Sequence, residues 1–318
     1  MTASKRSGWN SLLVYGLLLA AVPARAGELA GPRYQIQGFA AQSLISSTSN
    51  YFFGDSRDRI STGFTEAGLH GTWQVLDALR LSGQVLYRRA GDSDKDGLRV
   101  DYAQADWQFY QTDVSQLGLK FGKVKLPYGL YNETRDVPFT RPGILLPQSV
   151  YFDNSRSLLL AAPGIFAHGA TVQTYGAAEF SLGWVRPDFN SESVEYNFLG
   201  INRPGKLEGR GSFITRLRWD TPADTTLMLT YADLRANYTP GTPDQLAAGG
   251  LRYRNLLATA QQRFDTVTLT AEYSEPSVDY RGFGRRLPSR QRPARPPGMF
   301  NDECRGNRFL AARGIGPG

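Results

Sequence analysis

Apolar and polar side chains alternate in repeated short segments along most of the chain between Tyr34 and Tyr280. In the segment 65–75, Leu69 and Trp73 fall on one side, whereas Glu66 and His70 fall on the other. A period of two residues is typical of a β-strand with two different faces. We count about eleven such segments: Tyr34–Ala40, Thr65–Val75, Leu79–Tyr87, Ala103–Phe109, Leu117–Phe121, Ala170–Tyr175, Phe180–Trp184, Phe213–Trp219, Leu227–Tyr231, Leu251–Gln261 and Val267–Tyr273.

The connections between these segments alternate in length. Short ones lie at 76–78, 111–115, 176–178, 222–225 and near 265, and long ones at 46–61, 91–97, 126–169, 190–210 and 240–250. Short turns at one end and long loops at the other are typical of transmembrane barrels. The pattern therefore predicts an all-β fold, an antiparallel up-and-down transmembrane β-barrel. A soluble β-sandwich or periplasmic β-protein, the alternative, would have strands of about 5–6 residues.

The first 26 residues have the layout of a secretory signal. Lys5 and Arg6 precede an apolar run from Leu12 to Val22, and small residues surround a cleavage position after Ala26. The run is too short for a membrane span, although a membrane anchor is the alternative. We therefore expect a signal peptide at 1–26, a barrel at 27–283 and a separate tail at 284–318, with the mature chain in the cell outer membrane.

The tail departs from the strand pattern. It holds eight Arg, five Pro and the single cysteine, Cys304, and shows no alternation. The leader carries +3 and the tail +6 of the net charge of +7, so the body carries −2, and we expect no nucleic-acid partner. One interpretation is a disordered basic tail that contacts acidic lipopolysaccharide; the other is an out-of-frame extension of a truncated barrel.

Catalytic and metal motifs are weak. The two histidines, His70 and His168, accompany no serine motif, so an outer-membrane phospholipase that depends on His70 is a minor hypothesis and we expect no enzyme. The segment 92–97 resembles the start of a calcium loop but lacks the carboxylate at its twelfth position, so a solvated hairpin tip is the alternative. Its candidate ligands are Asp92, Asp94 and Asp96. We expect no cofactor.

Strand parity places many basic residues on the polar side, which would line a pore. These are Arg80, Arg88, Lys120, Arg216, Arg218, Arg252 and Arg254, with Lys123 and Lys125 at the end of one strand. Rings of Arg and Lys attract anions into a pore. The alternative is that each cation pairs with a carboxylate across the lumen and contributes little selectivity.

The run Gly122-Lys123-Val124-Lys125-Leu126-Pro127-Tyr128-Gly129-Leu130 resembles a motif of the phosphate-selective porin O/P family of Gram-negative outer-membrane porins. The resemblance implies a homotrimer of barrels with roughly sixteen strands each. It also implies a long third loop that folds inward, narrows the pore and leaves a passive channel for small anionic solutes. The chain departs from the family because it lacks a conventional C-terminal strand.

These observations predict a porin whose constriction is built by the proline-rich stretch between Lys120 and Gly164. The expected constriction residues are Arg135, Arg141, Arg156, Glu133 and Asp136. The expected partners are outer-membrane lipid and lipopolysaccharide, the barrel assembly machinery, two further copies of the chain and small anionic solutes. The alternative functions are a non-conducting structural or adhesive barrel and a non-functional truncated porin fragment.

Overall fold

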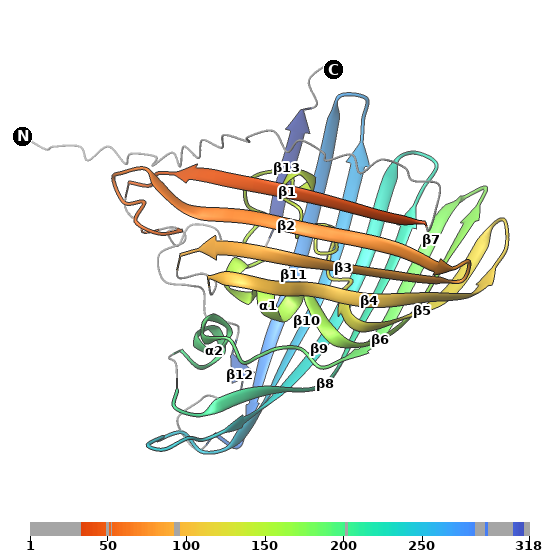
Figure 1. The fold of residues 1–318 in the computed structure, drawn as a ribbon. Helices are drawn as coiled ribbons and strands as arrows, with labels where there is room; N and C mark the ends of the chain where they lie inside the picture. Colours follow the sequence, from red (N-terminus) through yellow and green to blue (C-terminus); the bar gives the residue numbers. More distant parts are fainter. Residues whose placement is uncertain are drawn as a thin grey trace, which may run out of the picture.

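The computed structural model describes residues 33–48, 51, 53–91, 96–200 and 203–283, together with the backbone of residues 290–291 and 308–314. Eleven long strands make up most of it (Figure 1). They are β1 Tyr34–Ile45, β2 Ser61–Leu76, β3 Leu79–Ala90, β4 Gly97–Gln111, β5 Ser115–Lys125, β6 Ala161–Gln173, β7 Gly176–Val185, β8 Lys206–Asp220, β9 Thr225–Thr239, β10 Gly249–Arg263 and β11 Val267–Arg281.

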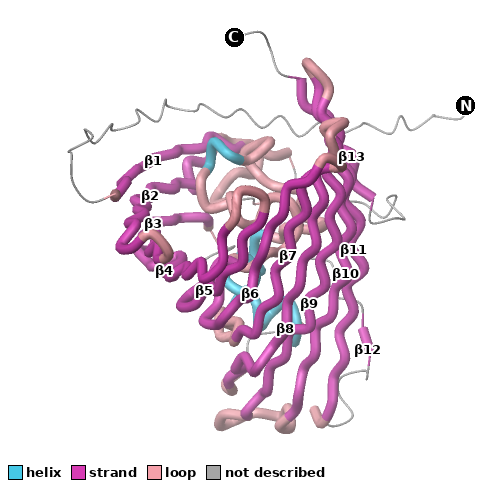
Figure 2. Tube along the Cα trace, turned by 90° about the vertical axis from the view of Figure 1, so that its right-hand side faces the viewer, coloured by secondary structure: helices cyan, strands magenta, loops and turns pink. Residues whose placement is uncertain are grey.

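Each of these strands pairs antiparallel with its neighbours in the chain, so β1 to β11 follow one another in a single up-and-down sheet. The sheet curves around the loops and helices, which lie on its concave side (Figure 2). The predicted all-β, up-and-down architecture is confirmed, and the eleven predicted segments correspond to β1–β11 in order. Within the described residues, no ladder joins β1 to the far end of the sheet.

Two short strands lie in the part of the chain that we predicted as a separate tail. The backbone of β12, Arg290–Gln291, runs beside Val278 and Asp279, and that of β13, Arg308–Gly314, runs beside the first half of β11. The sequence pattern did not predict these strands, because alternation is absent there. The signal segment 1–26 lies outside the described residues.

The strand boundaries differ most at β6. We predicted a loop as far as Gly169, but the strand begins at Ala161 and pairs with β5 from there, with Pro163 opposite Lys123. Small residues and a proline remove the alternation between Ala161 and Gly164, so the pattern concealed the start of the strand. The long internal loop therefore covers Leu126 to Leu160.

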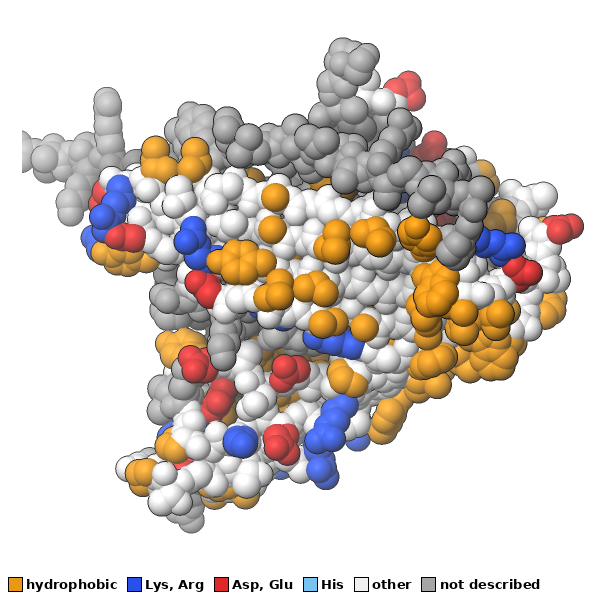
Figure 3. All heavy atoms as spheres, viewed as in Figure 1, with side chains coloured by type: hydrophobic (Ala, Val, Ile, Leu, Met, Phe, Trp, Pro, Cys, Tyr) orange, Lys and Arg blue, Asp and Glu red, His pale blue; other side chains and the backbone are white. Residues whose placement is uncertain are grey.

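The two faces of the sheet differ in chemistry. Large apolar side chains are exposed on the convex face, and hydrophobic groups spread over the middle and right of the strands in Figure 3. Charged side chains gather toward the left and the bottom of the same view, where the long loops lie. We call the convex apolar zone the outer belt; it includes Trp107, Phe180, Trp184, Leu217, Leu229, Leu256 and Tyr273.

The largest hydrophobic core lies on the concave side, toward the long-loop end. Leu126, Tyr151 and Leu158 of the long internal loop pack there against Leu257 of β10 and Val278 of β11. Helix α2, Glu192–Leu199, adds Val194 and Phe198 to this core. None of the helices in the described part of the chain is long and apolar enough to cross a membrane.

Candidate functional site

The loop from Leu126 to Leu160, which we call the inner loop, is the main feature of the concave face. It contains the short helices η1 Pro138–Thr140, η2 Asp153–Ser155 and α1 Arg156–Leu159. Its two ends are joined by Asn132, whose buried amide donates hydrogen bonds to the carbonyl oxygens of Leu126 at 2.8 Å and Leu159 at 2.6 Å. The inner loop is therefore a closed unit with a fixed shape.

One side of the inner loop binds the strands at the end of the sheet. The carboxylate of Glu272 on β11 accepts hydrogen bonds from the Tyr151 hydroxyl at 2.7 Å and the Leu130 N–H at 3.3 Å. The Gly129 N–H donates to Thr230 on β9 at 3.4 Å. The Tyr128 hydroxyl accepts a hydrogen bond from Asn255 on β10.

The other side of the inner loop is bound to β2–β4 by ion pairs. Arg141 donates to both carboxylate oxygens of Glu66 on β2, at 2.7 and 3.0 Å. Arg156 forms the same two-pronged contact with Asp101 on β4, at 3.2 and 2.5 Å. Arg88 of β3 bridges Glu66 at 3.0 Å and Asp153 of the loop at 2.7 Å.

These contacts offset most of the positive charge of the inner loop and its surroundings. Arg88, Arg99, Arg135, Arg141, Arg156 and Lys125 face Glu66, Asp101, Asp136 and Asp153, which leaves two positive charges in excess. Buried carboxylates of this kind require cationic partners. The predicted constriction arginines thus lie together, and each is buried against a carboxylate.

The electrostatics of Asp153 follow from this arrangement. Burial alone would raise the pKa of its carboxyl group, but Arg88 at 2.7 Å and Arg135 at 3.6 Å lower that pKa overall. Burial lowers the pKa of the Arg135 guanidinium to about 10, although Asp153 opposes this shift. Both groups are charged at neutral pH, so the pair is an ionic contact in the folded protein.

The inner face of the sheet outside the loop network carries further charges. Arg216 pairs with Glu133 of the inner loop, and Arg218 pairs with Asp220 at 2.8 Å. Arg80 and Lys120 lie in register on either side of Asp106, which also binds His168 at 2.8 Å, and the Arg80 side chain donates to Gln74 at 3.0 Å. These two predicted pore-lining cations share one carboxylate, which leaves one positive charge in excess.

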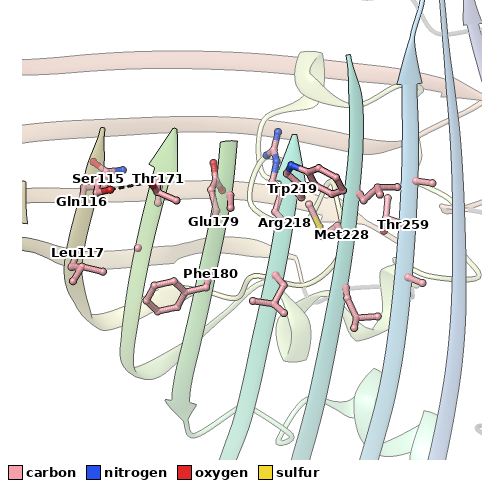
Figure 4. A pocket seen from close by; sticks show the side chains of 18 of the residues that line it. Ser115, Gln116, Leu117, Thr171, Glu179, Phe180, Arg218, Trp219, Met228 and Thr259 are labelled. Carbon is pink, nitrogen blue, oxygen red and sulfur yellow. Dashed lines mark hydrogen bonds between the residues drawn. The ribbon is translucent and has the colours of Figure 1, made fainter. Parts of the chain in front are cut away.

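A pocket of about 1410 Å³ lies near the short turns of β4–β11. Successive residues of each strand line this pocket, so that its lining includes both polar side chains of the inner face and apolar side chains of the outer belt. Figure 4 shows Glu179 and Arg218 on adjacent strands, with Leu117 and Phe180 lower in the view. Ser115 and Thr171 are joined there by a hydrogen bond of 2.9 Å.

Two predicted pore-lining residues lie on the opposite face. Arg252 and Arg254 point away from the concave side, because Leu251 and Leu257 of the same strand are buried in the inner core. We predicted that the apolar residues of this strand face the lipid. This prediction is wrong at the long-loop end, where apolar residues of the inner loop pack against the concave face of the strand. Lys123 donates to the Val100 carbonyl oxygen at 2.7 Å, and Lys125 binds Asp136 at 2.8 Å.

The remaining sequence-based hypotheses find no supporting geometry. Asp92 and Asp94 lie outside the described residues, and the described chain contains no cluster of three or more His, Cys, Asp or Glu side chains able to hold a metal. His70 hydrogen-bonds to Gln37 at 3.0 Å and His168 to Asp106 at 2.8 Å. Among the described residues neither histidine hydrogen-bonds to a serine.

Sequence reasoning placed Glu66 and Glu272 on the polar side of their strands, but it did not predict that Glu66, Asp101, Glu272, Asp153 and Tyr151 are partners within this site. Glu66, Asp101 and Glu272 sit on strands, and Asp153 and Tyr151 sit in the loop, but nothing local marks them as partners. Strand parity gave one usable signal, since Glu66 and Glu272 both occupy polar positions of alternating segments. An unpaired carboxylate facing a barrel interior has to find a donor.

Comparisons with known proteins give only distant likenesses. No protein-family model matches the chain, and no curated protein matches it. Among solved structures, the trimer form of OmpT, an outer membrane protein of Vibrio cholerae, is similar with 13% identity, coverage of 78% of this chain and 76% of that chain, and a TM-score of 0.33. OmpF of Salmonella typhi in complex with daunomycin has 11% identity, coverage of 78% and 80%, and a TM-score of 0.42. The outer membrane channel DcaP of Acinetobacter baumannii has 11% identity, coverage of 82% and 94%, and a TM-score of 0.24.

Proposed function

We propose that this chain is an outer-membrane protein of the porin type, a passive diffusion channel for small solutes narrowed by its inner loop. The observation that carries the proposal is the attachment of that loop to the concave face at both sides, through Glu66 on β2 and Glu272 on β11. The outer belt supports a membrane position, because an exposed apolar band on long strands suits hydrocarbon. Export with cleavage after Ala26, insertion by the barrel assembly machinery and a homotrimer belong to the same proposal.

The proposal includes a modest preference for anions. It rests on Lys120 and Arg80, which face the concave side with a single carboxylate, Asp106, between them. The loop arginines contribute little to this preference, because their charge is offset by Glu66, Asp101 and Asp153. Membership of the phosphate-selective family remains a prediction from the motif at Gly122–Leu130.

Reversal potentials across a planar bilayer test this function. We expect the chain to conduct and to favour anions. We expect R80Q/K120Q to reduce the anion-to-cation permeability ratio by about two- to fivefold, because each charge in a water-filled pore contributes on the order of 1 kcal/mol or less. R235Q is the matched control, because Arg235 lies on the outer face of the sheet. Its replacement removes one positive charge, as does each of the two tested substitutions. Cation selectivity in the unmodified channel would contradict the electrostatic part.

A non-conducting barrel is the second candidate, and the inner core favours it. Apolar side chains of the inner loop, α2 and β8–β11 fill the concave side at the long-loop end. Conductance distinguishes the two candidates. In one variant, residues 137–150 are replaced by a short glycine–serine linker. If the inserted parent passes no current and this variant does, the protein is a plugged barrel rather than a porin.

A further inference from the structure

Three arginines lie directly opposite one another on the outer face of the sheet. Arg210 of β8 pairs in register with Arg235 of β9, which pairs in register with Arg252 of β10. The inward neighbours Leu234 and Leu251 are buried, so the three guanidinium groups project outward. Like charges at directly paired positions destabilise a sheet. We call these three residues the arginine row.

The row is only partly neutralised by the protein. Asp233 accepts from Arg235 at 3.1 Å and from Arg252 at 2.5 Å, whereas the neighbouring Arg254 binds Asp279 at 2.6 Å. Four arginines therefore share two carboxylates, an excess of two positive charges. Arg210 and Arg235 are exposed, and Arg210 has no ion-pair partner within the described residues.

The distance of the arginine row from the outer belt indicates which part of the membrane surrounds it. On β8, Arg210 and Trp219 are eight ladder positions apart, counted on the partner strand because β8 bulges between Arg210 and Phe213. That is about 26 Å along a strand and about 20 Å across a membrane at the usual tilt. The apolar band of an outer-membrane barrel is about 25 Å tall. The row thus lies close to the edge of the hydrocarbon, on the side of the long loops, which in such barrels is the cell exterior.

We propose that the arginine row binds the phosphate groups of the glycolipid that forms the outer leaflet, lipopolysaccharide. Guanidinium groups bind phosphate in two-pronged, charge-assisted contacts, and a bound phosphate would relieve the repulsion along the row. The lipid's acyl chains would lie over Leu229 and Leu256, which are exposed on the same strands. The inference rests on the proposed function only for the location of the chain in the outer membrane.

The surface fits this ligand better than it fits pore solutes or a protein. The row points away from the concave face and so lies outside any channel. A protein partner would have to cover these exposed arginines and supply carboxylates for them. A phosphorylated lipid meets both the charge and the adjoining apolar zone at once.

The test measures binding of fluorescent lipid A carrying two phosphates to the full chain in detergent micelles. We expect R210Q/R235Q to weaken binding on the order of tenfold, because each arginine near an anionic lipid surface contributes substantially. This variant leaves the Arg252–Asp233 pair intact. R33Q/R263Q, which removes two cations near the short turns, should bind as the parent does, and R210K/R235K should retain most of the affinity.

Other outcomes overturn the proposal. Equal binding by R210Q/R235Q and the parent, with unchanged circular dichroism, would show that the row is not the site. Equal affinity for lipid A stripped of its phosphates would exclude phosphate recognition, and competition by millimolar inorganic phosphate would indicate a solute site. A shift in oligomer size for R210Q/R235Q without a change in lipid binding would identify a subunit contact. Because binding is measured in micelles, a failure of conductance leaves this test unaffected.

Discussion

Asp153 shows how a single buried carboxylate holds the inner loop. It lies between Arg88 of β3 and Arg135 of the loop, at 2.7 and 3.6 Å. Its pKa is lowered in the folded protein, so the folded state favours the ionised form. Its contribution to stability is complete above the ordinary carboxyl pKa of about 3.9 and is lost as pH falls through the lower, folded value.

We therefore expect D153N to lower the free energy of unfolding at neutral pH by about 3 kcal/mol, because two buried arginines lose a partner. The difference between the parent and D153N should shrink below about pH 4, where the parent carboxylate becomes protonated. Thermal unfolding in detergent at pH 7 and at pH 3 measures both effects. A difference that is equal at the two pH values would contradict the ionic role.

The same scale shows what the sequence could predict about the site. Arg135, Arg141 and Arg156 were identified because a loop rich in proline and arginine interrupts the strand pattern. Their partners were not, since Glu66 is separated from Arg141 by 75 positions and Asp101 from Arg156 by 55. Such pairs depend on the curvature of the whole sheet, which local patterns do not contain.

At the scale of the strands, glycine and phenylalanine occupy directly paired positions. Phe39 lies opposite Gly68, and Phe166 lies opposite Gly183. In each pair the ring covers the glycine, so that a Cβ added at Gly183 would overlap the Phe166 ring. The absence of a side chain thus lets a large ring lie flat against the inner wall.

We expect G183A to lower the free energy of unfolding by about 1–3 kcal/mol, the usual cost of overpacking. F166L should recover part of this loss in the double variant G183A/F166L, because the smaller side chain leaves room. G71A is the matched control, since a Cβ at Gly71 on β2 meets only ordinary contacts. Additive effects of the two substitutions would contradict a direct contact.

Alternation predicted the existence and order of β1–β11 well, because the middle of each strand separates lipid-like and polar surroundings. It failed where that separation ends. At β6, small residues remove the alternation from the first part of the strand. On β10, apolar residues face the inner core instead of the lipid, so Arg252 and Arg254 were assigned to the wrong face. Both failures occur at the end of the sheet that the inner loop occupies.

At the scale of the whole molecule, Glu272 connects the inner loop to the last long strand. It accepts hydrogen bonds from Tyr151, Leu130 and Thr259, and it is buried. Replacing a buried acceptor leaves its donors unsatisfied, at a cost of about 1–3 kcal/mol.

We expect E272A to raise the rate of protease cleavage within the inner loop by about tenfold or more, because cleavage follows the population of the detached loop. E275A is the matched control, since Glu275 lies on the same strand but faces outward. Limited proteolysis with fragment masses locates the cut. Cleavage at equal rates in both variants would show that Glu272 does not hold the loop.

The contacts of the inner loop also require a particular order of steps during folding. Each long strand pairs with its immediate neighbours in the chain, so the sheet can grow one hairpin at a time from β1 onward. The inner loop precedes β6 in the chain, yet Leu130 and Tyr131 bind residues that lie 142 and 139 positions later. These hydrogen bonds cannot form until β11 is in place. An inner loop that has formed them therefore shows that β11 has paired in the correct register.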